Sequence, residues 1–181
     1  MKKTLYALTE TACLVALAVV LSWIKISTGG FGGSIDFVMI PLFVICYRRG
    51  FLYGVAGGLV FGFIKCLIGG GIGYGLISIL LDYVLAYGAI GVAGLFKGKS
   101  AFLEVSAFLG CFARYIIHFI SGITIYAITV PTEVTEGLVI GSPFLYSLIY
   151  NALYMLPNTV IAIIFMSLLR APLKRLNKKF I

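Results

Sequence analysis

The sequence predicts an all-α integral membrane protein with six transmembrane helices and both termini in the cytoplasm. Of its 181 residues, 61% are hydrophobic and only 11% are charged, and the mean hydropathy is +1.12. No soluble globular domain has this composition. The apolar residues form long stretches, and the lysines and arginines behind the net charge of +8 gather at the ends of those stretches. We interpret these basic residues as topology signals and not as a nucleic-acid-binding surface.

We expect one membrane domain, residues 1–181, without a separate soluble domain. The predicted spans are approximately residues 5–24, 35–47, 51–68, 76–96, 101–128 and 143–169. The first stretch is too long for the core of a signal peptide and lacks a small-residue cleavage site, so we expect it to remain as the first span. Its Ala12 and Ala16 lie on one helix face, where small side chains let a second helix approach closely. That second helix could belong to another subunit or to this chain.

The second span is the least regular of the six. Residues 25–34, KISTGGFGGS, contain four glycines and predict an irregular loop outside the membrane. The apolar stretch 35–47 has only 13 residues, whereas a helix needs about 20 to cross a bilayer. We expect this span to begin below the membrane rim, with Asp36 at its outer end and a kink at Pro41.

The third span and the loop after it also carry polar or flexible features. Lys65 lies near the outer end of span 51–68, where a lysine can extend to the membrane surface. Residues 69–75, GGGIGYG, form a second glycine-rich segment. This segment contains GxGxG, but a nucleotide-binding fingerprint would need a preceding strand. We therefore interpret it as an external loop or lid.

The basic residues place the two termini on one side of the membrane. That side would hold Lys2, Lys3, Arg48, Arg49, Lys97, Lys99, Arg170, Lys174, Arg175, Lys178 and Lys179. The other side would hold Lys25, Lys65 and the acidic residues Asp36, Glu133 and Glu136. Because cytoplasmic loops carry the excess of lysine and arginine, the side with the termini is predicted to be cytoplasmic.

A polar stripe on span 101–128 is the strongest functional signal. At 100° per residue, Arg114, His118, Ser121, Gly122 and Tyr126 fall within one arc of the helix. A polar stripe in a membrane must face a cavity or a protein partner, because exposure to hydrocarbon is costly. A functional site is the default interpretation, and a structural contact between helices is the alternative.

Two other spans carry polar residues at a similar depth. With a rise of about 1.5 Å per residue, Asp82, His118 and Asn151 all fall in the outer half of the membrane. Tyr83 follows Asp82, and Tyr146, Tyr126 and Asp36 fall nearer the rim. The sequence therefore predicts one pocket that opens outward. Its carboxylates and aromatic faces suit a flat, cationic, heteroaromatic ligand.

The residues do not indicate catalysis or a metal centre. An intramembrane enzyme would need a nucleophile with a base, or several metal ligands, and the chain has one histidine and no HExxH. The four cysteines are scattered through apolar stretches and are interpreted as packing residues. We expect no catalytic residues, no metal and no cofactor. An ion-coupled carrier with Asp82 as its ion site remains an alternative function.

Four stretches in this order resemble a known family. They are GGSIDFVMIP, LLDYVLAYGAIGVAGLF, RYIIHFISGITIY and YSLIYNALYMLPN. Together they resemble the substrate-binding S component of an energy-coupling factor (ECF) vitamin transporter of the thiamine-specific type. The resemblance covers essentially the whole chain and implies a six-helix fold in a bacterial cell membrane, with an external pocket for thiamine.

The resemblance also assigns roles to individual residues. It implies that Asp82 and Tyr83 contact the aminopyrimidine of thiamine and that His118 and Tyr126 stack on its rings. The remaining expected contacts are hydrogen bonds from Tyr146 and Asn151, with Asp36 near the pocket. Some relatives have glutamate at the positions of Asp36 and Asp82, and tryptophan at that of Tyr126. These differences leave the pyrimidine precursor of thiamine as an alternative ligand.

The same resemblance implies partner proteins. Ala12 and Ala16 would face the transmembrane coupling subunit, EcfT, and two ATPase subunits would supply the energy. The chain itself has no GxxxxGK[ST] motif, so it cannot power uptake through a P-loop of its own. Binding of the vitamin without catalysis is the activity expected of this chain.

Overall fold

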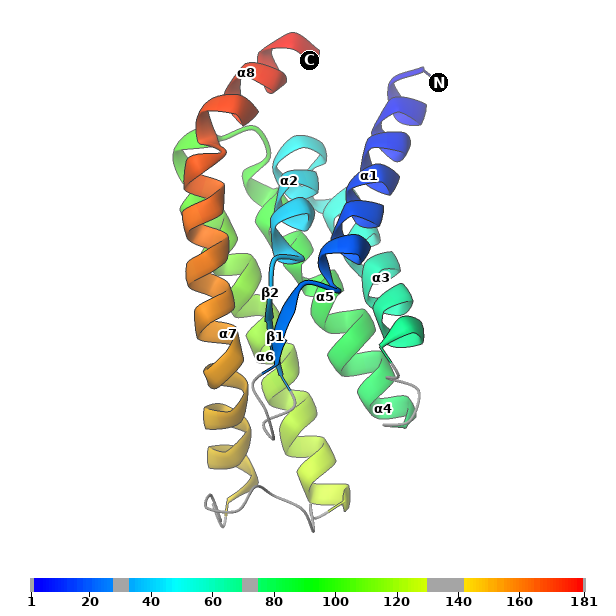
Figure 1. Ribbon diagram of the computed structural model, residues 1–181, viewed down its shortest axis with the longest axis vertical. Coiled ribbons are helices and arrows are strands. Elements are labelled where there is room, and N and C mark those ends of the chain that lie inside the picture. Colours follow the sequence, from blue (N-terminus) through cyan, green and yellow to red (C-terminus); the bar gives the residue numbers. More distant parts are fainter. Residues whose placement is uncertain (1, 28–32, 70–74, 130–141, 181) are drawn as a thin grey trace.

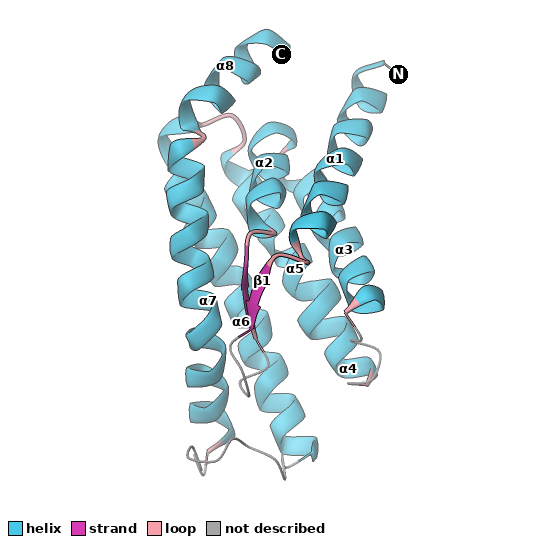
Figure 2. Cartoon of the chain, in the orientation of Figure 1, coloured by secondary structure: helices cyan, strands magenta, loops and turns pink. Residues whose placement is uncertain are grey.

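The computed structural model describes residues 2–27, 33–69, 75–129 and 142–180, and within these ranges it leaves out the side chains of 125–129 and 177–180. Figure 1 shows a bundle of long helices whose two chain ends lie at the same end of the molecule, at the top of the view. Figure 2 shows that helices make up nearly all of the described chain and that the strands form one short ribbon.

The long elements are α1 (Lys2–Leu21), α3 (Phe51–Ile68), α6 (Leu103–Thr129) and α7 (Pro143–Leu168). A further rod consists of α4 (Leu76–Ser78), η3 (Ile79–Leu85), α5 (Ala86–Ala89) and η4 (Ile90–Phe96), and η5 (Ser100–Phe102) leads into α6. In the described residues, five helical segments are long and apolar enough to cross a membrane: Lys2–Leu21, Phe51–Ile68, Leu76–Phe96, Ser100–Thr124 and Pro143–Leu168.

The structure differs from the expected second span, residues 35–47. Residues Ser34–Asp36 form a strand, β2, which pairs antiparallel with β1 (Lys25–Ser27), and the helix α2 covers only Met39–Arg49. The expected irregular loop is therefore a two-stranded ribbon at both of its described ends. Pro41 is the third residue of α2, where its missing N–H has no partner within the helix to lose. A proline at this position therefore does not force a kink in the helix, contrary to the expectation.

The rod from α4 to η4 has an irregular helical geometry. Its segment η3 is a π-helix and its segment η4 is a 3₁₀ helix, and π-helical turns are frequent at functional sites. The rod packs very closely on α3, since a Cβ atom on Gly62 would lie 2.2 Å from the carbonyl oxygen of Tyr83, and one on Gly58 equally close to that of Tyr87. Only glycine permits this approach. The two contacts fix the position of η3 along the axis of α3.

The short helix α2 forms the centre of the core. Phe43 and Ile45 are almost completely buried, and α2 contacts α1, α3, α7 and η4. At the end of the molecule that carries the termini, Glu10 of α1 forms ion pairs with Arg48 and Arg49 at the end of α2. Because α2 is surrounded by other elements, it sets the position of the ribbon that precedes it.

The basic C-terminal residues form a helix. This helix, α8 (Arg170–Phe180), follows α7 directly and bends away from its axis in Figure 1. Arg170 forms an ion pair with Glu104 at the start of α6, and Leu173 is buried. These contacts hold α8 against the same end of the bundle as the N-terminus.

Candidate ligand-binding site

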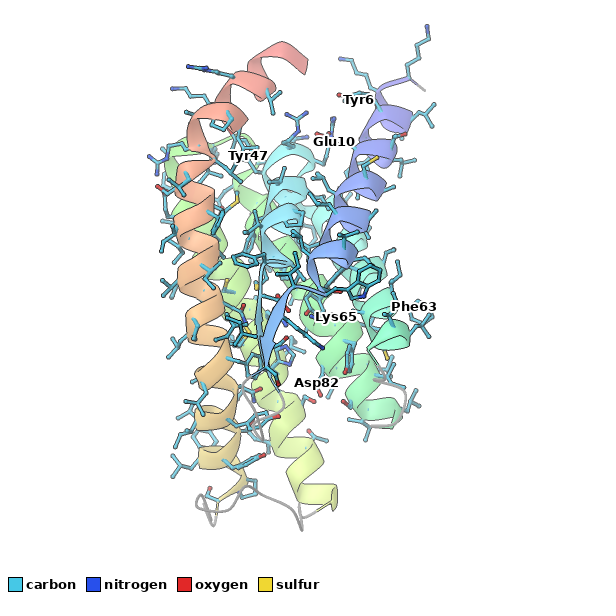
Figure 3. The ribbon with its side chains drawn as sticks, viewed as in Figure 1. Tyr6, Glu10, Tyr47, Phe63, Lys65 and Asp82 are labelled. Carbon is cyan, nitrogen blue, oxygen red and sulfur yellow. The ribbon has the colours of Figure 1, made fainter. Side chains whose placement is uncertain are left out.

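A cavity of about 470 Å³ lies among β1, β2, α3, η3, α6 and α7. Its size is within the range of about 300–1,000 Å³ that is typical of small-molecule sites. Figure 3 shows Lys65 and Asp82 in the middle of the view, well away from Tyr6 and Glu10 at the N-terminal end of α1. The cavity therefore lies apart from the basic end of the molecule.

Asp82 is the carboxylate of this cavity, and η3 presents it to three hydrogen-bonding side chains. Its Oδ1 is 2.9 Å from His118 Nδ1, while its Oδ2 accepts hydrogen bonds from Ser121 Oγ at 2.7 Å and from Ser78 Oγ at 3.0 Å. A quarter of the Asp82 side chain is still exposed. The carboxylate is thus held in one orientation with part of its surface open to the cavity.

His118 and Arg114 are neighbours on the polar stripe of α6. Arg114 Nε donates to His118 Nε2 at 3.2 Å, and the guanidinium carbon lies 4.1 Å from the centre of the Tyr87 ring. The rings of Tyr154 and His118 form a T-shaped pair, with 5.8 Å between ring centres. Both ring nitrogens of His118 are therefore engaged by protein groups, and its ring faces remain its means of contacting a ligand.

A second polar cluster ties the ribbon to two helices. Lys65 Nζ of α3 lies 2.9 Å from Asp36 Oδ2 on β2, and it also lies over the ring of Tyr87. Asn158 of α7 accepts from the Asp36 backbone N–H at 3.0 Å and donates to the Ser34 carbonyl at 2.8 Å. The Asn158 side chain thus pairs with β2 as a neighbouring strand would.

The polar side chains of α7 complete the wall of the cavity. Asn151 Nδ2 donates to the His118 carbonyl oxygen at 3.2 Å and to the Ser147 carbonyl oxygen at 2.9 Å. Its Oδ1 accepts from the Tyr154 hydroxyl at 2.7 Å. A Cβ on Gly122 would lie 2.3 Å from Ser147 Oγ, so this glycine lets α6 and α7 approach closely at the cavity.

Comparison with known proteins decides the family. A family model described as "Thiamine transporter protein (Thia_YuaJ)" matches residues 8–178. The chain belongs to this family. Two relatives carry the name thiamine transporter ThiT. One, from Bacillus subtilis strain 168, is 36% identical over 97% of this chain and 96% of its own length, and the other, from Lacticaseibacillus paracasei, is 28% identical over 92% and 88%.

A solved structure of ThiT from Listeria monocytogenes has the same fold. It superposes with a TM-score of 0.81 at 26% sequence identity and covers 94% of this chain and 96% of its own. The resemblance to a thiamine-specific S component is confirmed by these relatives. The family and the apolar helices make this chain a multi-pass bacterial membrane protein and a transport protein rather than an enzyme.

Most of the family-derived site residues come together at the cavity. The expected residues that line it are Asp82, Tyr83, His118, Tyr146 and Asn151. Asp36 does not line it: its side chain is only 3% exposed and pairs with Lys65, which does line the cavity. Tyr126 lies in α6, but its side chain is outside the described residues. The roles of all these residues toward a ligand stay predictions.

Several lining residues were not among the expected site residues. The main ones are Lys65, Arg114, Tyr87, Tyr150 and Tyr154. The expected extension of Lys65 to the membrane surface is wrong, because its ammonium group turns inward to Asp36. A charge within an apolar span could have indicated this, since buried charges require partners. In the described part of the chain, no three His, Cys, Asp or Glu side chains gather to hold a metal ion.

Proposed function

We propose that this chain is the high-affinity substrate-binding S component of an ECF-type transporter that imports thiamine across the bacterial cell membrane. The observation that carries the proposal is Asp82, which three side chains orient within a cavity rich in tyrosine. Thiamine joins an aminopyrimidine, which offers N–H donors, to a cationic thiazolium ring. A carboxylate with aromatic walls complements both parts.

The proposed binding mode assigns one end of thiamine to Asp82. Its amino group would donate to the exposed part of the Asp82 carboxylate, with Tyr83 beside it on η3. The face of His118 and the tyrosine rings of α7 would contact the two heterocycles, together with Tyr126. Asn151 holds the His118 carbonyl oxygen and the Tyr154 hydroxyl in place, which supports a pocket formed before the ligand arrives.

We expect calorimetric titration of the purified protein to show one saturable thiamine site per chain. Riboflavin and biotin serve as controls and should not compete, because neither combines an aminopyrimidine with a cationic ring. The pyrimidine precursor alone should bind more weakly than thiamine, since it leaves the thiazolium contacts unmade. Tight binding of the precursor together with no binding of thiamine would show that the precursor, and not thiamine, is the ligand of this chain.

The proposal includes six membrane crossings with both termini in the cytoplasm and a cavity that opens outward. The second crossing would combine α2 with the β1–β2 ribbon, which together replace one long helix. Two observations support this topology: the chain ends lie at the same end of the molecule, and that end carries the basic α8 and the Arg48–Arg49 pair.

Single-cysteine labelling tests this topology. In a background without the four native cysteines, Ser27→Cys and Lys97→Cys should react with a membrane-impermeant reagent from opposite sides of the membrane. Both positions are exposed in the structure, so a reagent can reach them. Labelling of both positions from the same side would contradict the six-crossing arrangement.

The proposed partners are EcfT and two ATPase subunits. The support from this chain is α1, which packs through Ala7, Thr11, Val15 and Ala18 and leaves the face with Ala12 and Ala16 exposed. Small exposed side chains on a membrane helix permit close docking of another helix. Vesicles that contain this chain alone should therefore not accumulate thiamine, whereas an ion-coupled carrier would.

A further inference from the structure

A chain of hydrogen bonds connects a buried arginine to the cavity carboxylate through the single histidine of the sequence. Arg114 and His118 are each only 6% exposed. Arg114 Nε donates to His118 Nε2, and His118 Nδ1 lies 2.9 Å from Asp82 Oδ1. The Arg114 guanidinium is itself held by the Tyr87 ring and by Met39 Sδ, 3.1 Å from its Nη1.

This arrangement determines which nitrogen of His118 carries the proton. An arginine side chain has only hydrogen-bond donors, so a nitrogen that faces Arg114 Nε must accept. His118 Nε2 is therefore unprotonated, and the ring proton is on Nδ1, where it is donated to Asp82. The hydroxyl of Tyr154, the ring packed against His118, donates its own proton to Asn151 Oδ1.

The tautomer has a consequence for the charge of the cavity. A protonated His118 would form an ion pair with Asp82 and would weaken the attraction of the carboxylate for a cation. A neutral His118 orients the carboxylate without cancelling its charge. The other two donors, Ser78 and Ser121, are neutral as well, and within the described residues no lysine or arginine forms an ion pair with Asp82.

We propose that Arg114 is a positioning residue that holds His118 as the neutral Nδ1–H tautomer and so reserves the charge of Asp82 for a cationic ligand. The part that concerns the ligand rests on the proposed function, whereas the tautomer is a property of the protein without ligand. Arg114 thus acts on specificity through His118 and does not need to touch the ligand itself.

Nitrogen NMR of histidine-labelled protein tests the tautomer directly. The sequence has one histidine, so a protein purified with a histidine-free tag gives the signals of one imidazole. We expect a protonated Nδ1 and an unprotonated Nε2 in the ligand-free protein. Arg114→Met removes the donor to Nε2 and should shift the ring toward the Nε2–H tautomer or the cation. Arg114→Lys retains a donor and should restore the native signals.

Thiamine titration of the same proteins tests the consequence for binding. Arg114→Met should weaken thiamine binding by about tenfold, the effect of losing roughly one hydrogen bond to a charged group, and Arg114→Lys should recover most of it. Arg48→Met is the matched control, because it also removes a buried arginine, one that pairs with Glu10 far from the cavity. This control should change neither the imidazole signals nor the affinity.

Three results would overturn the proposal. The first is a wild-type ring protonated at Nε2, alone or together with Nδ1. The second is an Arg114→Met protein whose imidazole signals equal those of the wild type. The third is an Arg114→Met protein whose imidazole signals change while its affinity for thiamine does not. If Arg114→Met does not fold, the wild-type and Arg114→Lys spectra still decide. A native Nδ1–H tautomer in a protein that fails to bind thiamine would support the tautomer and contradict the proposed function.

Discussion

Asp82→Asn is expected to weaken thiamine binding by about tenfold to a hundredfold. The substitution keeps the volume of the side chain but removes its charge. It also replaces one acceptor oxygen by an NH₂ group, which cannot accept from His118 or from the two serines that bond this carboxylate. The loss of a hydrogen bond to a charged group in a buried site costs roughly 1.5–3 kcal/mol, which corresponds to that range of affinity. Calorimetry of the purified proteins measures the change.

Glu104→Gln is the matched control for this experiment. It makes the same chemical change on a carboxylate of α6 that pairs with Arg170 near the basic end of the molecule. Its thiamine affinity should equal that of the unmodified protein. Equal affinities of the Asp82→Asn and Glu104→Gln proteins would show that Asp82 has no part in ligand recognition.

Ala16→Phe is expected to abolish thiamine uptake while thiamine binding stays intact. Ala16 lies on the exposed face of α1, whereas α1 packs against α2 and α3 through its opposite face. A phenylalanine at this position would prevent the close approach of a helix from EcfT to the small residues on this face of α1. It would not reach the cavity, whose lining begins beyond α1 at Lys25. Binding is measured on the purified chain, and uptake in cells that also express EcfT and the two ATPases.

Val160→Phe on α7 is the corresponding control. Val160 is 55% exposed, so the added ring has room on the surface of the bundle and no docking role is assigned to that position. Uptake should remain normal in this variant. If Ala16→Phe lowers binding and uptake together, the Ala12–Ala16 face is needed for folding, and the docking surface lies elsewhere.

The long helices of this fold could be predicted from the sequence because hydropathy and glycine boundaries mark them. The span expected at 51–68 matches α3, and the last expected span, 143–169, ends one residue beyond α7. The ribbon could not be predicted, because its strands have three residues each and stand beside a glycine-rich segment. The contact that ties β2 to α7 comes from Asn158, which is distant in sequence.

The candidate site was predictable where polar residues stand out in apolar helices. Asp82, His118 and Asn151 could be brought together by their depth alone, and the structure places all three at one cavity. The direction of Lys65 was predicted wrongly, because a lysine near a helix end commonly extends to the membrane surface, whereas this one turns inward to Asp36. Tyr87 looks like an ordinary packing residue until the π-helix η3 and the glycines of α3 place it beneath Arg114.

Mass spectrometry of the small molecule that remains bound through purification tests the central claim most directly. A high-affinity S component should retain its vitamin, so the protein released by denaturation should yield thiamine in a ratio approaching one molecule per chain. The Asp82→Asn protein, prepared in parallel, should yield much less. A different molecule in that ratio, such as the pyrimidine precursor or another vitamin, would contradict the assignment of thiamine to this cavity.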